Sequence, residues 1–64
     1  MRDFRTGDRV ELDPALDAWR EGDHYGEVHA ITRRRVIVRL DTSRRLYSTH
    51  PDNLTIIDAA YPRF

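Results

Sequence analysis

The segment ITRRRVIVRLDTSRRLY, residues 31–47, contains the clearest strand of the sequence, with an arginine-rich turn on each side of it. Every second residue in its middle is apolar and shares one side of an extended chain: Val36, Val38 and Leu40. The opposite side carries Arg35, Ile37, Arg39 and Asp41. Alternation with a period of two is typical of a strand buried on one face, and β-branched residues favour extended backbone. The pattern therefore predicts a strand over 35–41 between two tight turns.

Four further segments with the same alternation flank this strand: residues 9–12, 25–31, 46–50 and 54–57. Gly26 in the second strand indicates a bulge or the close approach of another backbone. In the fourth strand, Leu46 and Ser48 share one face, whereas Tyr47 and Thr49 share the other. Leu46 is the most apolar of these four side chains, so its face is predicted to point into the core.

The connections between the strands differ in length. Residues 13–24 form a long one, in which Asp13, Pro14 and Gly22 suit a cap, a first helical position and a helix end. An isolated helix this short is marginal, so we expect a structured loop with one or two helical turns at most. Residues 51–53, Pro-Asp-Asn, predict a tight or 3₁₀ turn before the last strand.

Five short strands in 64 residues predict an all-β fold, closed into a small barrel because a flat sheet of this size cannot bury one face. We expect one domain over 1–64, with a core over about 6–57, a long and partly helical loop between the first two strands, and a tail over 58–64. Tyr61 and Phe64 are the candidate anchors of this tail. The predicted core comprises Val10, Leu12, Leu16, Trp19, Val28, Ala30, Val36, Val38, Leu40, Leu46, Leu54 and Ile56.

Composition excludes several classes of protein. The chain has no cysteine, and therefore neither a disulfide framework nor a thiolate zinc site. Its first residues include no apolar run suited to a signal peptide or a membrane span, which predicts a cytoplasmic protein without membrane attachment. The formal net charge is zero, yet residues 1–32 carry −4 and residues 33–64 carry +4, and all eleven basic side chains are arginine.

The order of these parts resembles an SH3-like barrel of the KOW and Tudor kind. The matching features are GDRVEL at 7–12, the long loop, YGEV at 25–28, two tight hairpins and PDNL at 51–54. More narrowly, GDRVELDPALDAWREGDHYGEV, VIVRLDTS and HPDNL are similar to small proteins of actinobacterial phages and prophages. The resemblance implies a binding module for nucleic acid, for ribosomal or polymerase partners, or for peptides. Arg44 stands where such chains commonly have glycine, which leaves the type of that turn open.

Six arginines form a candidate nucleic-acid site, called here the arginine stripe: Arg33, Arg34, Arg35, Arg39, Arg44 and Arg45. The turns at the two ends of the strand over 35–41 lie about 20 Å apart at ~3.3 Å per residue, which spans several phosphates of a duplex. Tyr47 on the next strand is the predicted stacking partner. The alternative is that these arginines are a solvated rim, which guards the aggregation-prone VIV segment and pairs with the acidic first half.

Three aromatic residues define a second candidate site, for a host or phage protein: Trp19, Tyr25 and Tyr47. In a Tudor-like barrel these positions gather at one end, where an aromatic wall holds a cation, a proline or a base. Acidic residues of the long loop could attract a basic partner to that end or simply face solvent: Asp13, Asp17, Glu21 and Asp23. Trp19 is also well explained as a lid over the barrel mouth that enlarges a small core.

Enzymatic chemistry has little support in the sequence. Its three histidines fall on a loop, a strand and a turn without the spacing of a zinc site: His24, His29 and His50. Ser43 and Ser48 lack a nucleophile turn, and no glycine-rich segment suits phosphate. We therefore expect a non-enzymatic module without cofactor or metal, which binds nucleic acid (DNA or RNA) or, alternatively, a protein. We expect a monomer, or a weak homo-oligomer that associates through a strand edge.

Overall fold

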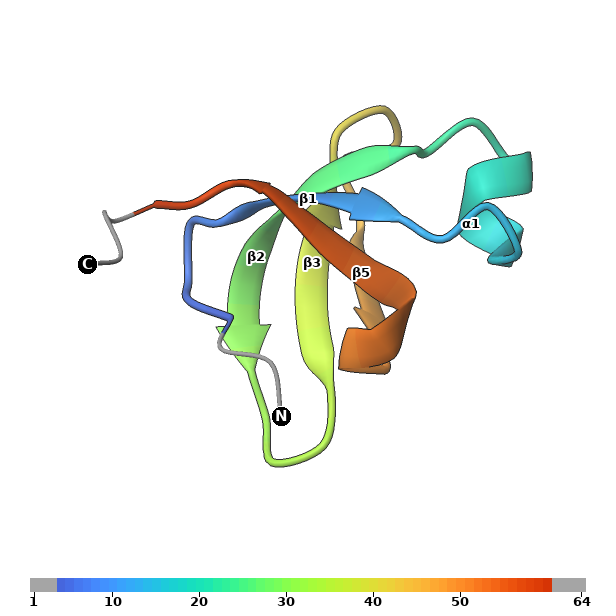
Figure 1. Cartoon of the computed structure of the whole chain (residues 1–64). Coiled ribbons are helices and arrows are strands. Elements are labelled where there is room, and N and C mark those ends of the chain that lie inside the picture. Colours follow the sequence, from blue (N-terminus) through green and yellow to red (C-terminus); the bar gives the residue numbers. More distant parts are fainter. Residues whose placement is uncertain (1–3, 61–64) are drawn as a thin grey trace.

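A computed structural model describes residues 4–60 and shows a mostly-sheet domain with little helix (Figure 1). Its strands form one five-stranded antiparallel sheet in the order β4-β3-β2-β1-β5. The elements are β1 (Arg9–Leu12), α1 (Asp17–Arg20), β2 (Tyr25–Ile31), β3 (Val36–Leu40), β4 (Leu46–Thr49), the 3₁₀ turn η1 (Pro51–Asn53) and β5 (Leu54–Asp58). The all-β prediction is confirmed at this level. No helix among residues 4–60 is long and apolar enough to cross a membrane.

The long strand β2 joins the two halves of the sheet. Its first residues pair with β1, where Val10 lies opposite Gly26, and its whole length pairs with β3. The register with β3 shifts between Val28 and Ala30. A bulge of this kind bends a strand and increases its twist, which lets β2 pair with both β1 and β3. Figure 1 shows the result, with β5 running obliquely beside β1 across the direction of β2 and β3.

The core lies on the inner face of this bent sheet. Its buried apolar residues are Phe4, Val10, Leu12, Ala18, Val28, Val36, Val38, Leu40 and Leu54. Four partly buried residues pack against them: Leu16, Trp19, Tyr47 and Ile56. Most of the predicted core is therefore in place. Phe4, Ala18 and Tyr47 are additions to it, whereas the predicted core residue Ala30 is only partly buried and lies outside it. Tyr61 and Phe64, the candidate anchors of the tail, lie outside the described residues.

The predicted inner face of β4 is wrong. Leu46 is 49% exposed, whereas Thr49 is buried and Tyr47 packs against the core. Pairing with β3 places Tyr47 opposite Val38 and Thr49 opposite Val36, so these two share the inner face with the buried valines. The buried hydroxyl of Thr49 accepts a hydrogen bond from the Asn53 side chain at 2.9 Å, which removes the cost of burying it.

The turn between β3 and β4 forces Arg44 into the left-handed region of backbone space, with φ at 68°. Residues with a Cβ atom rarely adopt this backbone conformation, because Cβ crowds the following carbonyl, whereas glycine adopts it freely. We expect Arg44→Gly to raise the free energy of unfolding by about 0.5 to 1 kcal/mol in urea denaturation. Arg44→Ala removes the same guanidinium group but keeps Cβ, so it should change stability little. Equal stabilities of the two variants would contradict a backbone origin.

Candidate functional site

The arginine stripe is divided between the two ends of β3. Arg33, Arg34 and Arg35 lie on the turn between β2 and β3, and Arg44 and Arg45 lie on the turn to β4 at the opposite end. Figure 1 shows these turns at opposite ends of the strand pair. Five residues of β3 at ~3.3 Å each separate them by about 17 Å. The stripe therefore consists of two clusters and the exposed Arg39 between them.

Two of these arginines, Arg35 and Arg45, already have a side-chain partner within the protein. Arg45 forms an ion pair with Glu21 of the long loop at 2.6 Å. Arg35 donates to the side-chain oxygen of Ser48 at 2.8 Å and to the Ser48 carbonyl at 3.0 Å. Arg39 lies opposite Glu27 in the sheet register. One ion pair, between Arg45 and Glu21, therefore joins the basic second half to the acidic first half.

Within residues 4–60, neither Arg33 nor Arg34 has a hydrogen bond or an ion pair. The side chains of Arg39 and Arg44 also lack one among these residues, but they line a different hollow, which they share with Glu27 and Asp41. The turn that carries Arg33 and Arg34 is closed by Thr32 and Arg35. The backbone N–H of Thr32 donates to the Arg35 carbonyl at 2.9 Å, and the Arg35 N–H donates to the Thr32 hydroxyl at 3.1 Å. These bonds leave Arg33 and Arg34 exposed at the tip of the turn.

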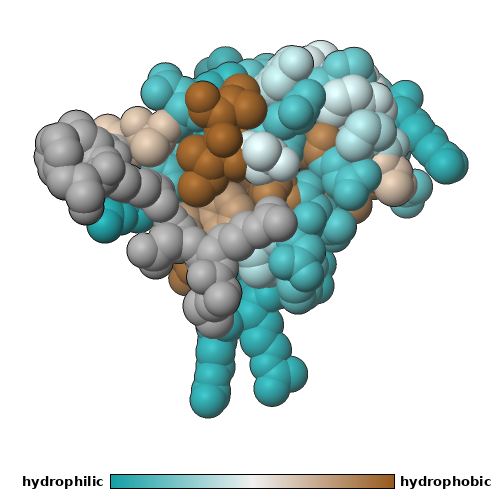
Figure 2. Space-filling model, in the orientation of Figure 1, coloured by the Kyte–Doolittle hydropathy of each residue, from teal (hydrophilic) through white to brown (hydrophobic). Residues whose placement is uncertain are grey.

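A groove of about 490 Å³ lies beside this tip, between the β2–β3 turn and η1. Its apolar lining comes from four separate segments: Phe4, Ile31, Val36 and Pro51. Its polar lining is Thr32, Arg33, Arg34, Arg35, His50 and Asp52. The volume falls within the range of small-ligand sites. Figure 2 shows long hydrophilic side chains extending beyond the body of the molecule at the end where the β2–β3 turn lies.

The wall of the groove opposite the arginines is fixed by η1. The Nδ1 atom of His50 accepts a hydrogen bond from the backbone N–H of Asp52 at 3.0 Å and thereby caps this turn. Pro51 at the first position needs no such acceptor, because it has no N–H. The Asp52 carboxylate lies 3.6 Å from the same His50 nitrogen. One wall is therefore cationic and the other carries a carboxylate.

The candidate aromatic wall is only partly assembled. The Trp19 and His24 rings are stacked with centroids 3.8 Å apart, and the Tyr25 ring meets His24 edge-on at 6.4 Å. Trp19 packs against the core, as the lid interpretation predicts. Tyr47 belongs to the inner face of the sheet, whereas Tyr25 is exposed on the outer face of β2. Tyr47 is thus separated from Tyr25, and also from the exposed Arg39 on the outer face of β3.

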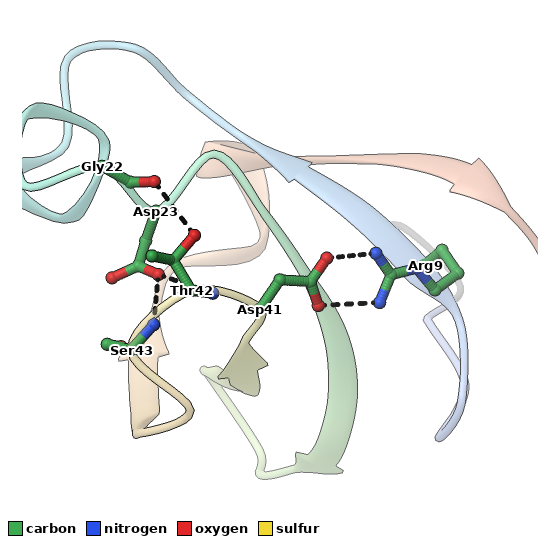
Figure 3. A network of polar contacts seen from close by, with 6 residues as sticks. All are labelled: Arg9, Gly22, Asp23, Asp41, Thr42 and Ser43. Atoms are coloured by element: carbon green, nitrogen blue, oxygen red, sulfur yellow. Dashed lines mark hydrogen bonds and ion pairs between the residues drawn. The ribbon is translucent and has the colours of Figure 1, made fainter.

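A second ion pair lies on the outer face, next to the arginine stripe. Asp41 accepts hydrogen bonds from both terminal nitrogens of Arg9, as Figure 3 shows. These hydrogen bonds lower the pKa of Asp41 below its ordinary value of 3.8, and they raise that of Arg9. Arg9, Glu27, Arg39, Asp41 and Arg44 line a smaller hollow of about 200 Å³ together with Leu40. Opposite charges are mixed there.

The lowered pKa of Asp41 predicts a pH-dependent contribution to stability. Because its pKa is lower in the folded state than in the unfolded chain, the pair stabilises the fold above the ordinary pKa and is lost as pH falls through the lowered one. Both side chains are more than a third exposed, so we expect Asp41→Asn to cost only about 0.5 kcal/mol at neutral pH. Urea denaturation of both proteins over a pH series measures this. A difference that persists at the lowest pH would contradict an ionic origin.

No protein-family model, curated protein or solved structure matches this chain. Within residues 4–60, no group of three or more His, Asp or Glu side chains is placed to hold a metal ion. Sequence inspection identified Arg33, Arg34 and Arg35 but missed the groove beside them, since its apolar lining comes from residues 4, 31, 36 and 51. Ile31, an exposed apolar residue two positions before Arg33, is a local signal of it.

Proposed function

We propose that this protein is a small non-enzymatic binding module that holds nucleic acid at the β2–β3 turn. The observation that carries the proposal is the pair of exposed arginines at the turn tip, Arg33 and Arg34, which lack a partner among residues 4–60 and lie beside a groove. Guanidinium groups bind phosphate oxygens in bidentate geometry and stack on bases. Because the net charge is zero, long-range steering is weak and we expect micromolar affinity.

The proposal includes a specific fold type, an SH3-like barrel. Three features support it: the strand order β4-β3-β2-β1-β5, the long connection with α1 between β1 and β2, and η1 between β4 and β5. A barrel filled by its own side chains has little room for an enzymatic cavity. Ligands of such a fold bind at its turns and rims, where the unpaired arginines lie.

The salt dependence of the binding constant shows how many arginines contact phosphate. Each neutralised phosphate contributes about −0.7 (single strand) to −0.9 (duplex) to the slope of log K against log salt concentration. Contact through Arg33 and Arg34 alone therefore predicts a slope of about −1.5 to −2, whereas use of the whole arginine stripe predicts about −4 to −5. We expect the smaller slope, because Arg35 and Arg45 have partners within the protein and because Arg39 and Arg44 share a hollow with the carboxylates of Glu27 and Asp41.

Charge reversal at the turn tip tests the proposal. We expect Arg34→Glu to lower the affinity for fluorescently labelled nucleic acid about tenfold in anisotropy titrations, and to reduce the salt slope by about 1. Arg20→Glu is the matched control, because Arg20 is exposed on α1 and changes the net charge equally. It should alter affinity less than about twofold. Equal losses in both variants would show that net charge, and not the turn, controls binding.

A protein-binding role is the alternative, and one observation favours it. Tyr25 is 42% exposed at the end of the acidic long loop, and its ring lies edge-on to His24, which stacks on Trp19. An exposed aromatic beside carboxylates suits a basic peptide. Nucleic-acid binding would depend on Arg33 and Arg34, whereas protein binding would depend on Tyr25. Absence of nucleic-acid binding at low salt, together with loss of a protein partner in Tyr25→Ala, would support this alternative instead.

A further inference from the structure

The groove beside Arg33 and Arg34 combines apolar lining residues with arginines. Resting on the proposed function, we propose that the protein binds single-stranded nucleic acid in preference to duplex, with a base in the groove and the adjoining phosphates on the turn-tip arginines. The groove has an apolar lining and a volume of about 490 Å³. A base can enter it only if it is splayed out from its neighbours, which single strands allow and duplexes resist.

A phosphate group alone would contact the arginines but would leave the apolar lining of the groove exposed to water. Ile31 is 47% exposed at the end of β2, and the partly buried Pro51 lines the groove with it. Contact with the flat face of a base would remove these apolar surfaces from water. Arg33 and Arg34 at the rim can stack on the same base through their planar guanidinium groups. A duplex, which presents only its backbone to the turn, leaves the groove unused.

The charges on the two walls orient the strand. Phosphates are attracted to Arg33 and Arg34 and repelled by the Asp52 carboxylate on the opposite wall. The edge of the base therefore points toward Asp52. An ionised carboxylate only accepts hydrogen bonds, so it pairs with the exocyclic amino group of cytosine or adenine and repels the O4 oxygen of thymine. The groove should thus prefer bases that carry an amino group at this edge.

Anisotropy titrations with labelled oligonucleotides of about ten nucleotides test both parts of the inference. We expect oligo(dC) to bind about fivefold or more tightly than oligo(dT), and both single strands to bind more tightly than a duplex of equal length. Equal or tighter binding of the duplex would overturn the single-strand inference and leave the proposed function intact. Binding of no nucleic acid, with binding of a labelled Glu-rich apolar peptide, would overturn both.

Two variants separate base contact from charge. Asp52→Asn should raise the affinity for oligo(dT) and reduce the dC to dT ratio to about twofold or less, because an amide both donates and accepts. An unchanged ratio would contradict contact between Asp52 and the base.

A charge placed in the groove tests whether the base occupies it. Ile31→Glu places a charge in the groove, whereas Ile57→Glu places one on an equally exposed residue of β5 outside it. Single-strand binding should fall about tenfold in the first and stay within about twofold in the second. Similar losses in both would overturn occupation of the groove.

Discussion

Gly26→Ala is expected to destabilise the fold by about 3 kcal/mol, which is half or more of the stability available to a domain of this size. A Cβ at this position would overlap Cγ1 of Val38 and lie 2.6 Å from the carbonyl oxygen of Arg39. Gly26 pairs with Val10 on one side and Leu40 on the other, so the strand cannot shift without disturbing both ladders. Val38 is fully buried and β-branched, and has few other rotamers. Urea denaturation followed by circular dichroism measures the loss.

A second substitution tests the steric explanation. In the Gly26→Ala background, Val38→Ala removes the overlapping methyl group but leaves the contact with the Arg39 carbonyl. We therefore expect the double variant to lose less stability than the sum of the two single variants, without reaching the wild type. A wild-type unfolding midpoint for Gly26→Ala, or simple additivity, would show that β2 and β3 are not this close at Gly26.

Local alternation predicted the strands well, because each strand buries one face of a short segment. The bounds of β1 and β2 agree with the sequence interpretation, and η1 lies where Pro-Asp-Asn indicated a turn. Alternation does not determine which face is buried when both faces are partly apolar. In β4, Leu46 and Tyr47 fall on opposite faces, and only the register with Val36 and Val38 selects the Tyr47 face. The same non-local pairing explains Gly26, for which the sequence indicated either a bulge or a close approach; the structure shows the close approach, to Val38 and Arg39.

The candidate site could be predicted only where it is local. Arg33 and Arg34 are adjacent in sequence at a recognisable turn, so their exposure followed from the pattern. The ion pairs of other arginines join distant residues, since Arg45 pairs with a residue 24 positions away and Arg9 with one 32 positions away. Asp23 was interpreted as one of several acids that attract a partner or face solvent. The structure buries it to 2% exposure instead.

The second large effect is expected at this buried aspartate. One oxygen of Asp23 accepts hydrogen bonds from the backbone N–H groups of Thr42 and Ser43, at 3.1 Å and 2.9 Å. Thr42 also donates its hydroxyl to the carbonyl of Gly22, so the long loop is fastened to the β3–β4 turn at two adjacent residues (Figure 3). Hydrogen bonds to a charged acceptor contribute about 1.5 to 3 kcal/mol each, and Asp23→Ala leaves two donors without a partner. We expect a loss of about 3 kcal/mol in the free energy of unfolding.

Trp19 fluorescence reports on the loop around Asp23. Trp19 is the only tryptophan of the sequence, and its ring stacks on His24, the neighbour of Asp23. Loosening of the loop in Asp23→Ala should increase quenching of Trp19 fluorescence by acrylamide before global unfolding begins. Asp23→Asn keeps one acceptor oxygen and should lose less than half as much stability. Asp13→Ala is the matched control, since Asp13 is exposed and accepts one local hydrogen bond from the Ala15 N–H, so its loss should stay below about 1 kcal/mol. If Asp13→Ala and Asp23→Ala cost the same, the attachment of the loop to the β3–β4 turn does not stabilise the fold.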